Sequence, residues 1–217
     1  MNARPVLLDL YCCAGGAARG YADAGFDVVG VDIVDQPNYP FEFHQADAIE
    51  FVTAHGGGFD AVHASPPCQR YSLAQRIRSR EHPDLVGATR QALVTTGRPW
   101  VIENVEGAPL ENPVLLCGAM FPGLRVYRHR LFETTFPLPV PPHPQHMARL
   151  TKMGRPPAAG EFMHVVGNFS GVQQAREAMG IDWMTRDGLR EAIPPAYTHH
   201  IGGALLRALT PRLGLVA

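Results

Sequence analysis

Residues 9–16 read Asp-Leu-Tyr-Cys-Cys-Ala-Gly-Gly and lie between an apolar run and a predicted helix. The run over 5–11 is apolar apart from Asp9, which is typical of a buried parallel strand. A helix closed by a glycine is expected over 16–24, and a second buried strand over 27–33. A strand, a small-residue turn, a helix and a strand together predict a βαβ unit.

The turn of this βαβ unit suits a nucleotide-like cofactor. Small residues allow backbone N–H groups to approach a ligand, and the following helix offers the positive end of its dipole. Asp32 ends the second strand about 20 residues after the glycines, so its carboxylate can accept hydrogen bonds from ribose hydroxyls. Asp47 is expected after a short third strand, where it could meet an adenine amino group. Helix–strand packing is the competing explanation for the glycines, and an exposed loop acid is the competing explanation for Asp47.

Residues 65–72, Ser-Pro-Pro-Cys-Gln-Arg-Tyr-Ser, leave a predicted fourth strand over 59–64. Two prolines stiffen this loop, because each fixes its own φ and restricts the residue before it. Cys68 follows the prolines directly, at the sheet edge where open α/β sheets bind ligands. The pattern favours a positioned nucleophile. A small apolar residue in a turn is the alternative.

Two further strands are predicted to carry charged groups. A strand over 100–102 leads to Glu103, whose carboxylate suits a hydrogen-bonded contact with a flat heterocycle. A strand over 126–134 would present Arg128 and Arg130 on one face, where they suit a phosphate or a developing negative charge. The alternatives are a carboxylate satisfied by the backbone and a solvated face of the strand.

Bulk composition limits the possible classes of protein. The 217 residues suit one domain, or one domain with a small appendage. The net charge of -1 gives no overall basic signal for nucleic acid, although alternating arginines over 75–81 could contact phosphates. The four cysteines show no paired metal spacing, which favours a reducing compartment. We see no signal peptide and no apolar run near the roughly 20 residues of a membrane span, so a cytoplasmic protein without membrane contact is expected.

The second half of the chain is less regular. Prolines crowd the segment 136–157, which predicts a linker or an irregular excursion. His143 and His146 lie within it and are expected to face solvent rather than bind metal, because no supporting cysteine or acid cluster is evident nearby. Other expected elements are a short apolar helix with Cys117 within 109–122, a strand over 163–169, a helix over 173–179 and a final helix capped by Thr198.

Four segments, taken in order, resemble the motifs of the cytosine-C5 DNA methyltransferase family. Residues 9–16 resemble its opening D-L-F-x-G-x-G-G, and Pro-Cys-Gln at 67–69 with Tyr-Ser at 71–72 resembles its catalytic loop. Glu-Asn-Val at 103–105 is similar to its E-N-V, and Arg-His-Arg at 128–130 to its R-x-R. The closing segment, residues 193–209, is only weakly similar. The compact length is that of small phage-encoded relatives.

The resemblance implies a Rossmann-like, doubly wound α/β fold with a mostly parallel sheet of the class I S-adenosylmethionine-dependent type. It implies a catalytic domain over 1–134, a linker with a reduced recognition segment over 135–192, and a C-terminal helix over 193–217 that packs back. The implied cofactor is S-adenosylmethionine, and the implied partner is DNA with a flipped cytosine, bound by a monomer without metal. The implied catalytic residues are Cys68, Glu103, Arg128 and Arg130. The implied cofactor-binding residues are Asp9, Tyr11, Cys12, Gly15, Gly16, Asp32, Ile33, Asp47, Ala48 and Pro66.

In the implied chemistry, the Cys68 thiolate attacks C6 of cytosine while Glu103 hydrogen-bonds N3 and the exocyclic amine. Arg130, with Arg128, would steady the base and lower the pKa of the thiol. Cys13 departs from the family pattern, because it stands where the first glycine would be. The short recognition segment predicts low sequence specificity or a short target site.

Three other readings remain open at this point. The same chemistry could act on RNA, on a free nucleotide or with an unusual alkyl donor. A non-catalytic relative could bind and mask DNA sites, with Cys13 as its best support. An NAD-type dehydrogenase fits the βαβ opening but leaves the Pro-Cys-Gln and Glu-Asn-Val motifs without a role.

Overall fold

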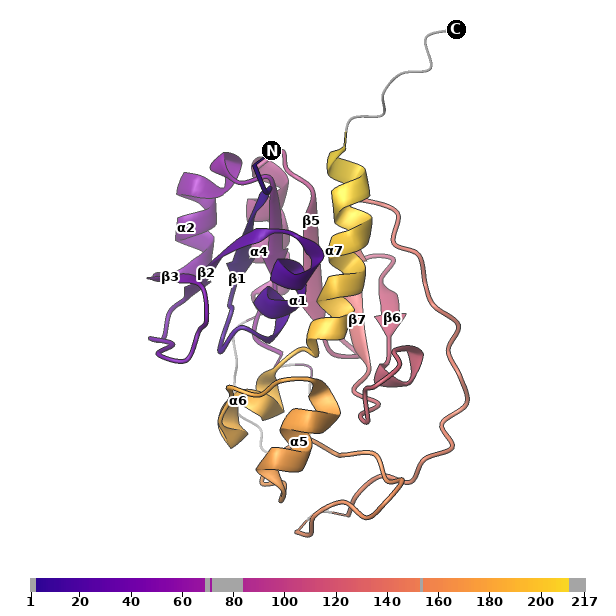
Figure 1. The fold of residues 1–217 in the computed structure, drawn as a ribbon. Coiled ribbons are helices and arrows are strands. Elements are labelled where there is room, and N and C mark those ends of the chain that lie inside the picture. The colour runs from indigo at the N-terminus through magenta and orange to yellow at the C-terminus, as the bar shows by residue number, and fades with distance from the viewer. Residues whose placement is uncertain (1–2, 69–70, 72–83, 153, 211–217) are drawn as a thin grey trace, which may run out of the picture.

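The computed structural model describes residues 3–68, 71, 84–152 and 154–210 (Figure 1). The expected arginine loop over 75–81 therefore lies outside the described residues, as do Gln69 and Ser72 of the cysteine loop. The elements in chain order are β1 (Val6–Leu10), α1 (Gly16–Ala24), β2 (Asp27–Asp32), β3 (Glu42–Gln45), α2 (Ala48–His55), η1 (Gly56–Gly58), β4 (Ala61–Ala64), α4 (Val86–Thr95), β5 (Trp100–Asn104), β6 (Val114–Leu116), η3 (Gly118–Met120), β7 (Arg130–Thr134), α5 (Val172–Met179), α6 (Arg186–Glu191) and α7 (Pro195–Leu209).

One sheet of seven strands organises the chain, in the order β3-β2-β1-β4-β5-β7-β6. The first five strands in this order pair in parallel, and β7 pairs antiparallel with both β5 and β6. The chain moves outward from β1 in one direction first and returns to the other side of β1 with β4. The expected doubly wound, mostly parallel α/β fold is confirmed.

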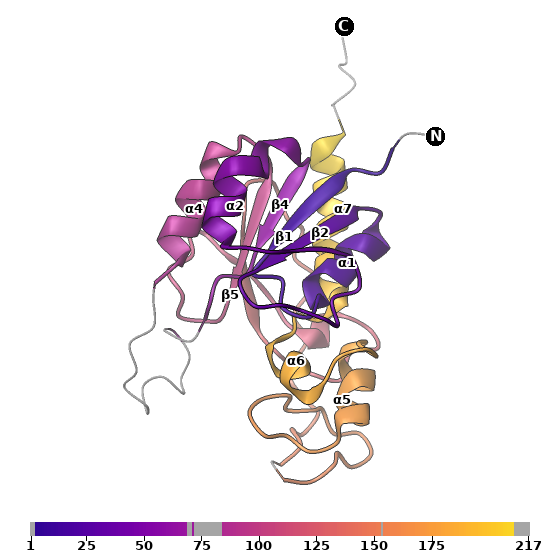
Figure 2. The same ribbon diagram turned by 90° about the vertical axis from the view of Figure 1, so that its left-hand side faces the viewer.

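Helices cover both faces of the sheet, as Figure 2 shows: α1 and α7 lie on one face, and α2 and α4 lie on the other. The strand period of two divides β1 between these layers. Leu7 packs into the α1–α7 core with Tyr21 and Tyr197, whereas Leu8 and Leu10 pack into the α2–α4 core. A strand that is buried on both faces must be apolar at almost every position, which is why the run 5–11 stood out in the sequence.

The segment with α5 and α6 forms a smaller unit at the carboxyl ends of the parallel strands (Figures 1 and 2). It has its own core around Phe169, Met179 and Leu189. The expected strand over 163–169 is not formed, although all seven of its residues are described; only an isolated bridge pairs Leu150 with Phe162. Its apolar residues Met163, Val165 and Phe169 pack into this small core instead.

Three sequence-based boundaries were wrong. The expected helix around Cys117 is strand β6 followed by the 3-10 turn η3, because the segment pairs with β7. Strand β7 begins at Arg130, so Arg128 precedes the strand in a left-handed conformation with φ 37° and the two arginines share no strand face. Helix α7 begins at Pro195, and Thr198 lies inside it, where its hydroxyl donates to the carbonyl of Ala17 at 2.8 Å.

Close packing of α1 against α7 makes Gly20 a sensitive position. A Cβ atom there would lie 2.1 Å from both the carbonyl oxygen of Pro195 and the hydroxyl of Thr198. We expect Gly20→Ala to lower the free energy of unfolding by about 1–3 kcal/mol, because the two helices must separate. Gly87→Ala is the matched control: Gly87 is an exposed residue of α4 with no atom within 4 Å of the added Cβ. It should be neutral or stabilising in the same urea titration. Equal stability of the two variants would contradict this packing argument.

Candidate active site

A cleft opens at the carboxyl ends of β1, β4 and β5. It is lined from β1 by Asp9 and Tyr11, from the loop after β4 by Pro66 and Cys68, and from β5 by Glu103. Strand order reverses between β1 and β4, and open α/β sheets bind ligands in the crevice at such a switch point. The topology therefore brings the glycine turn and the cysteine loop, which are about 50 residues apart in sequence, to one site.

Glu103 and Arg130 form a partly buried ion pair at the centre of this cleft. The Nε of Arg130 lies 3.0 Å from Oε1 of Glu103, and the two side chains are only 16% and 7% exposed. The pair forms because β5 and β7 are adjacent antiparallel strands. Burial raises the pKa of Glu103, and Arg130 opposes that rise. A carboxyl group with a raised pKa beside a guanidinium group can accept or donate a proton under mild conditions.

Cys68 lines the same cleft and interacts electrostatically with both members of the pair. Burial raises the pKa of its thiol, and Glu103 raises it further, whereas Arg130 and Arg128 lower it. The arginines lower the thiol pKa as expected, but burial first and the charge of Glu103 second outweigh them, so the net shift is upward. In this state the thiol is protonated at neutral pH. Loss of negative charge from Glu103 would favour the thiolate.

A series of buried polar groups reaches Glu103 from Tyr21 of α1. The hydroxyl of Tyr21 lies 2.9 Å from Nδ1 of His63, and Nε2 of His63 lies 3.0 Å from the hydroxyl of Ser65. Ser65 in turn hydrogen-bonds Glu103. His63 is fully buried, and burial lowers its pKa to about 3, so the ring is neutral and donates through one nitrogen only. With Ser65 donating to the carboxylate, His63 donates through Nε2–H and accepts from Tyr21 through Nδ1.

This series of hydrogen bonds from Tyr21 to Glu103 predicts the effect of Ser65→Ala. The Ser65 hydrogen bond favours the ionised carboxylate, so its removal should raise the pKa of Glu103 further. In the reaction proposed below, in which Glu103 is the proton donor, we expect the basic limb of the pH–rate profile to move to higher pH. Tyr21→Phe keeps Ser65 in place and should leave that limb unchanged while it destabilises the fold by about 1 kcal/mol. A basic limb that stays in place in Ser65→Ala would contradict the prediction.

The glycine turn forms the opposite wall of the cleft. Tyr11 and Cys13 both adopt left-handed conformations, with φ 56° and 45°. A left-handed φ at Cys13 is the conformation that a glycine adopts without strain, so this residue occupies a glycine-type position at some cost. The N–H of Cys13 donates to Asp32 at 3.0 Å, which ties the turn to the end of β2. Gly16 borders the cleft at the N-terminus of α1, which has no side-chain cap.

Several of the other predicted site residues do not line this cleft. A Cβ atom at Gly15 would meet Tyr39 and Pro40, and Asp47 caps α2 by accepting from the N–H groups of Ile49 and Glu50. Cys12 borders the cleft. The residues outside the lining of this cleft are Gly15, Asp32, Ile33, Asp47, Ala48 and Arg128.

Arg128 makes structural contacts with the backbone of the small α5–α6 unit. Its guanidinium donates to the carbonyl of Val165 at 3.0 Å and to that of Arg190 at 2.7 Å. These contacts hold the small α5–α6 unit against the start of β7, so Arg128, the first arginine of the R-x-R segment, connects the two parts of the chain. Ile33, in contrast, leaves 67% of its surface exposed beside the end of β2.

Residues from the far side of the cleft were not anticipated. Met184, Arg190, Glu191 and Ile193 line it from α6 and its flanking loops. The Nε1–H of Trp183 donates to the carbonyl of Ala14 at 2.8 Å, which fixes this unit to the glycine turn. No local pattern in the sequence marks these residues, because they reach the site only when the small unit docks on the sheet.

The fold is of the type found in class I S-adenosylmethionine-dependent methyltransferases. Over 94% of this chain and 99% of the other, it is similar to a solved E. coli prophage protein assigned as a DNA modification methyltransferase, with a TM-score of 0.67 and 14% identity. Over 96% of this chain and 99% of the other, it is similar to the Entamoeba histolytica methyltransferase EhMeth, with a TM-score of 0.60 and 11% identity. At these identities the likeness shows the fold.

Sequence comparison points in the same direction over a shorter stretch. The chain is 29% identical over 118 residues to the type II methyltransferase M.AgeI of Thalassovita gelatinovora. That match covers 46% of this chain and 28% of the relative's length. No family model matches the chain. No helix in the described part of the chain combines the length and hydropathy needed to cross a bilayer.

Proposed function

We propose that this protein transfers a methyl group from S-adenosylmethionine to C5 of cytosine in DNA. The observation that carries the proposal is the meeting of Cys68, Glu103 and Arg130 in one cleft beside the glycine turn. These groups come from three different strand ends, and their residue types are those that C5 methylation requires. The similarity to DNA methyltransferases in fold and in part of the sequence supports the same conclusion.

The residues beside β1 and β2 fit S-adenosylmethionine. The N-terminus of α1 has no side-chain cap and borders the cleft at Gly16, and Asp32 offers a carboxylate at the end of β2. Ile33 adds an exposed apolar side chain there, which suits the face of an adenine ring. Asp9, Tyr11 and Gly16 would contact the part of the cofactor nearest to the base. When bound, the cofactor supplies an electrophilic methyl group; the remaining chemistry belongs to the chain.

The catalytic residues act on the pyrimidine ring in a fixed order. The Cys68 thiolate forms a bond to C6, and the electrons of the C5–C6 double bond move toward C5 as Glu103 donates a proton to N3. Arg130 stabilises the carboxylate left on Glu103. Carbon 5 then accepts the methyl group. Loss of the C5 proton to water expels the thiolate and restores the double bond, and N3 returns its proton to the Glu103 carboxylate. Protonated Glu103 and ionised Cys68 favour each other, because protonation removes the negative charge that raises the thiol pKa.

A cytosine within a duplex cannot reach this cleft, so the proposal includes a base rotated out of the helix. Labelled S-adenosylmethionine offered with duplex DNA, single-stranded DNA, tRNA or dCMP separates the possible acceptors. We expect label at cytosine C5 of DNA. Base-resolution sequencing of DNA from cells that express the protein should show 5-methylcytosine, and cells with Cys68→Ser should not. Label in tRNA alone would transfer the proposal to RNA.

The non-catalytic alternative rests on Cys13, whose side chain borders the cleft in a strained backbone conformation. Duplex DNA with 5-fluorocytosine distinguishes the two, because fluorine at C5 cannot leave as a proton does and the adduct persists. We expect a covalent complex through Cys68 only when S-adenosylmethionine is present. DNA binding without an adduct would favour a masking protein.

A further inference from the structure

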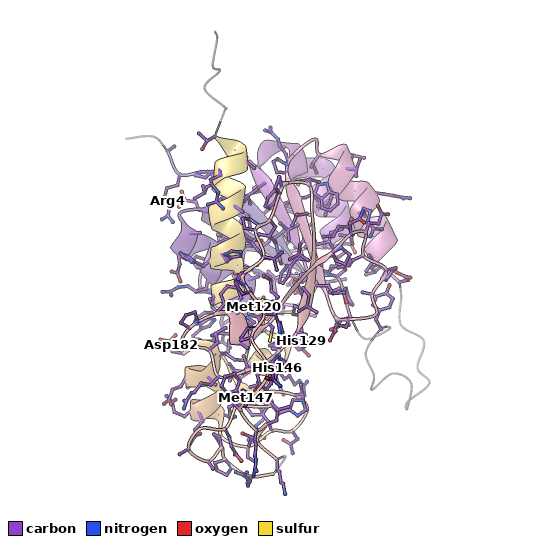
Figure 3. The ribbon with its side chains drawn as sticks, turned by 90° about the vertical axis from the view of Figure 1, so that its right-hand side faces the viewer. Arg4, Met120, His129, His146, Met147 and Asp182 are labelled. Carbon is purple, nitrogen blue, oxygen red and sulfur yellow. The ribbon has the colours of Figure 1, made fainter. Side chains whose placement is uncertain are left out.

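One cysteine and three histidines meet outside the cleft. Cys117 precedes η3, His129 precedes β7, and His143 and His146 lie in the proline-rich excursion. One ligand atom from each lies within 4.8 Å of all the others. The sequence places no cysteine near His143 and His146. In the fold, the proline-rich excursion lies next to Cys117, just after β6, and His129, just before β7, so a cysteine joins the histidines. Figure 3 shows His129 and His146 next to each other where the sheet meets the small unit.

We propose that Cys117, His129, His143 and His146 bind one Zn²⁺ ion. Tetrahedral zinc with Zn–N distances of about 2.0–2.1 Å places two ligand nitrogens about 3.4 Å apart. The Nε2 atoms of His129 and His143 lie 3.4 Å apart. The Sγ of Cys117 lies 3.2 Å from Nε2 of His146, close to the roughly 3.5 Å of a zinc-bound thiolate and imidazole.

Groups around these four residues hold them in position for a metal ion. Nδ1 of His129 lies 3.3 Å from a carboxylate oxygen of Glu106, so its Nε2 is left for the metal, as in carboxylate–histidine–zinc arrangements. The ring of His146 stacks on Tyr127, with 3.6 Å between centroids and 11° between planes. A backbone N–H of η3 donates to the sulfur of Cys117, which suits a thiolate ligand.

The ligand set indicates a structural ion. Three histidines and a cysteine fill a tetrahedral shell and leave no open position for water or substrate. The ion would link the proline-rich excursion to His129, the residue directly before Arg130. Metal binding would therefore affect the order of both the excursion and the cleft. The four ligand residues take no part in the proposed methyl transfer, so the metal site can be tested without an activity measurement.

The experiment uses the full chain, purified from zinc-supplemented cells and analysed for metal by mass spectrometry. We expect about one Zn²⁺ per chain. The chelated protein, titrated with Co²⁺, should show tetrahedral d–d bands and a thiolate-to-metal charge-transfer band. Cys117→Ser should lose the charge-transfer band. His143→Ala, which changes an exposed residue, should weaken Zn²⁺ binding by more than about 100-fold, beyond the 10–100-fold expected for Glu106→Gln.

His199→Ala is the matched control, because His199 is an exposed histidine of α7 outside the cluster. It should bind Zn²⁺ as the parent chain does. If Cys117→Ser fails to fold, His143→Ala and His146→Ala decide the matter. Three results would overturn the proposal: no Zn²⁺ bound by the parent chain, equally tight binding by His143→Ala, or Co²⁺ spectra without a thiolate band.

Discussion

Cys68→Ser should lower the rate of methyl transfer to DNA by on the order of 10³-fold or more, with cofactor binding retained. Among the described residues, a serine hydroxyl at this position has no partner able to take its proton, because Glu103 is paired with Arg130 and the hydrogen bonds from His63 lead to Glu103. The thiol, in contrast, can ionise once Glu103 is protonated. The measurement is single-turnover methylation of duplex DNA with labelled S-adenosylmethionine.

Binding and folding controls accompany this measurement. The Cys68→Ser chain should keep its thermal midpoint, because Cys68 lies in the cleft rather than in one of the hydrophobic cores. It should also bind S-adenosylmethionine with unchanged Kd and form no adduct with 5-fluorocytosine. A Cys68→Ser enzyme that methylates at the parent rate would rule out covalent catalysis by this residue.

Glu103→Gln should make Cys68 easier to ionise and at the same time slow methyl transfer. The amide cannot donate a proton to N3 as a carboxylic acid does, so we expect the single-turnover rate to fall by about 10²–10³-fold. The same change removes the charge that raises the pKa of Cys68, so the thiol pKa should fall toward its ordinary value. The variant would then hold a more reactive cysteine and be a poorer enzyme.

Alkylation with iodoacetamide over a range of pH, followed by peptide mass spectrometry, reads this thiol pKa directly. Peptide resolution is needed because Cys12, Cys13 and Cys117 are also free. In the parent chain, Cys68 should react only at high pH; in Glu103→Gln the profile should move to lower pH. Arg130→Gln should have the opposite effect, because loss of its positive charge should move the alkylation profile of Cys68 to higher pH. An unmoved profile in both variants would show that these groups do not control the thiol.

Residue patterns along the chain were sufficient to predict the parallel strands of the sheet and the turns that follow them. Strands buried on both faces must be apolar, and β1, β2 and β4 all show this over short runs. The turn residues after β1 and the two prolines before Cys68 then indicate where strands end. Because parallel strands place their carboxyl ends on one edge of the sheet, the cleft and its cysteine and carboxylate followed from these local signals.

The docking of the small unit could not be predicted in this way. Its segments carry few periodic runs, and Met184 and Glu191 reach the cleft only through packing of the unit on the glycine turn. The position of Arg128 depended on the same packing, since its guanidinium binds carbonyls of the small unit. Side-chain partners that come from distant segments leave no trace in local spacing.

The sequence by itself determined the order of strands and helices up to β5 and the chemical groups carried to the sheet edge, because local periodicity and turn residues encode both. Only the tertiary structure decided the protonation state of Cys68, since that depends on burial and on charges from two other strands. It also decided the meeting of Cys117 with three histidines up to 29 residues away, because the path of the proline-rich excursion is set by the surface on which it lies.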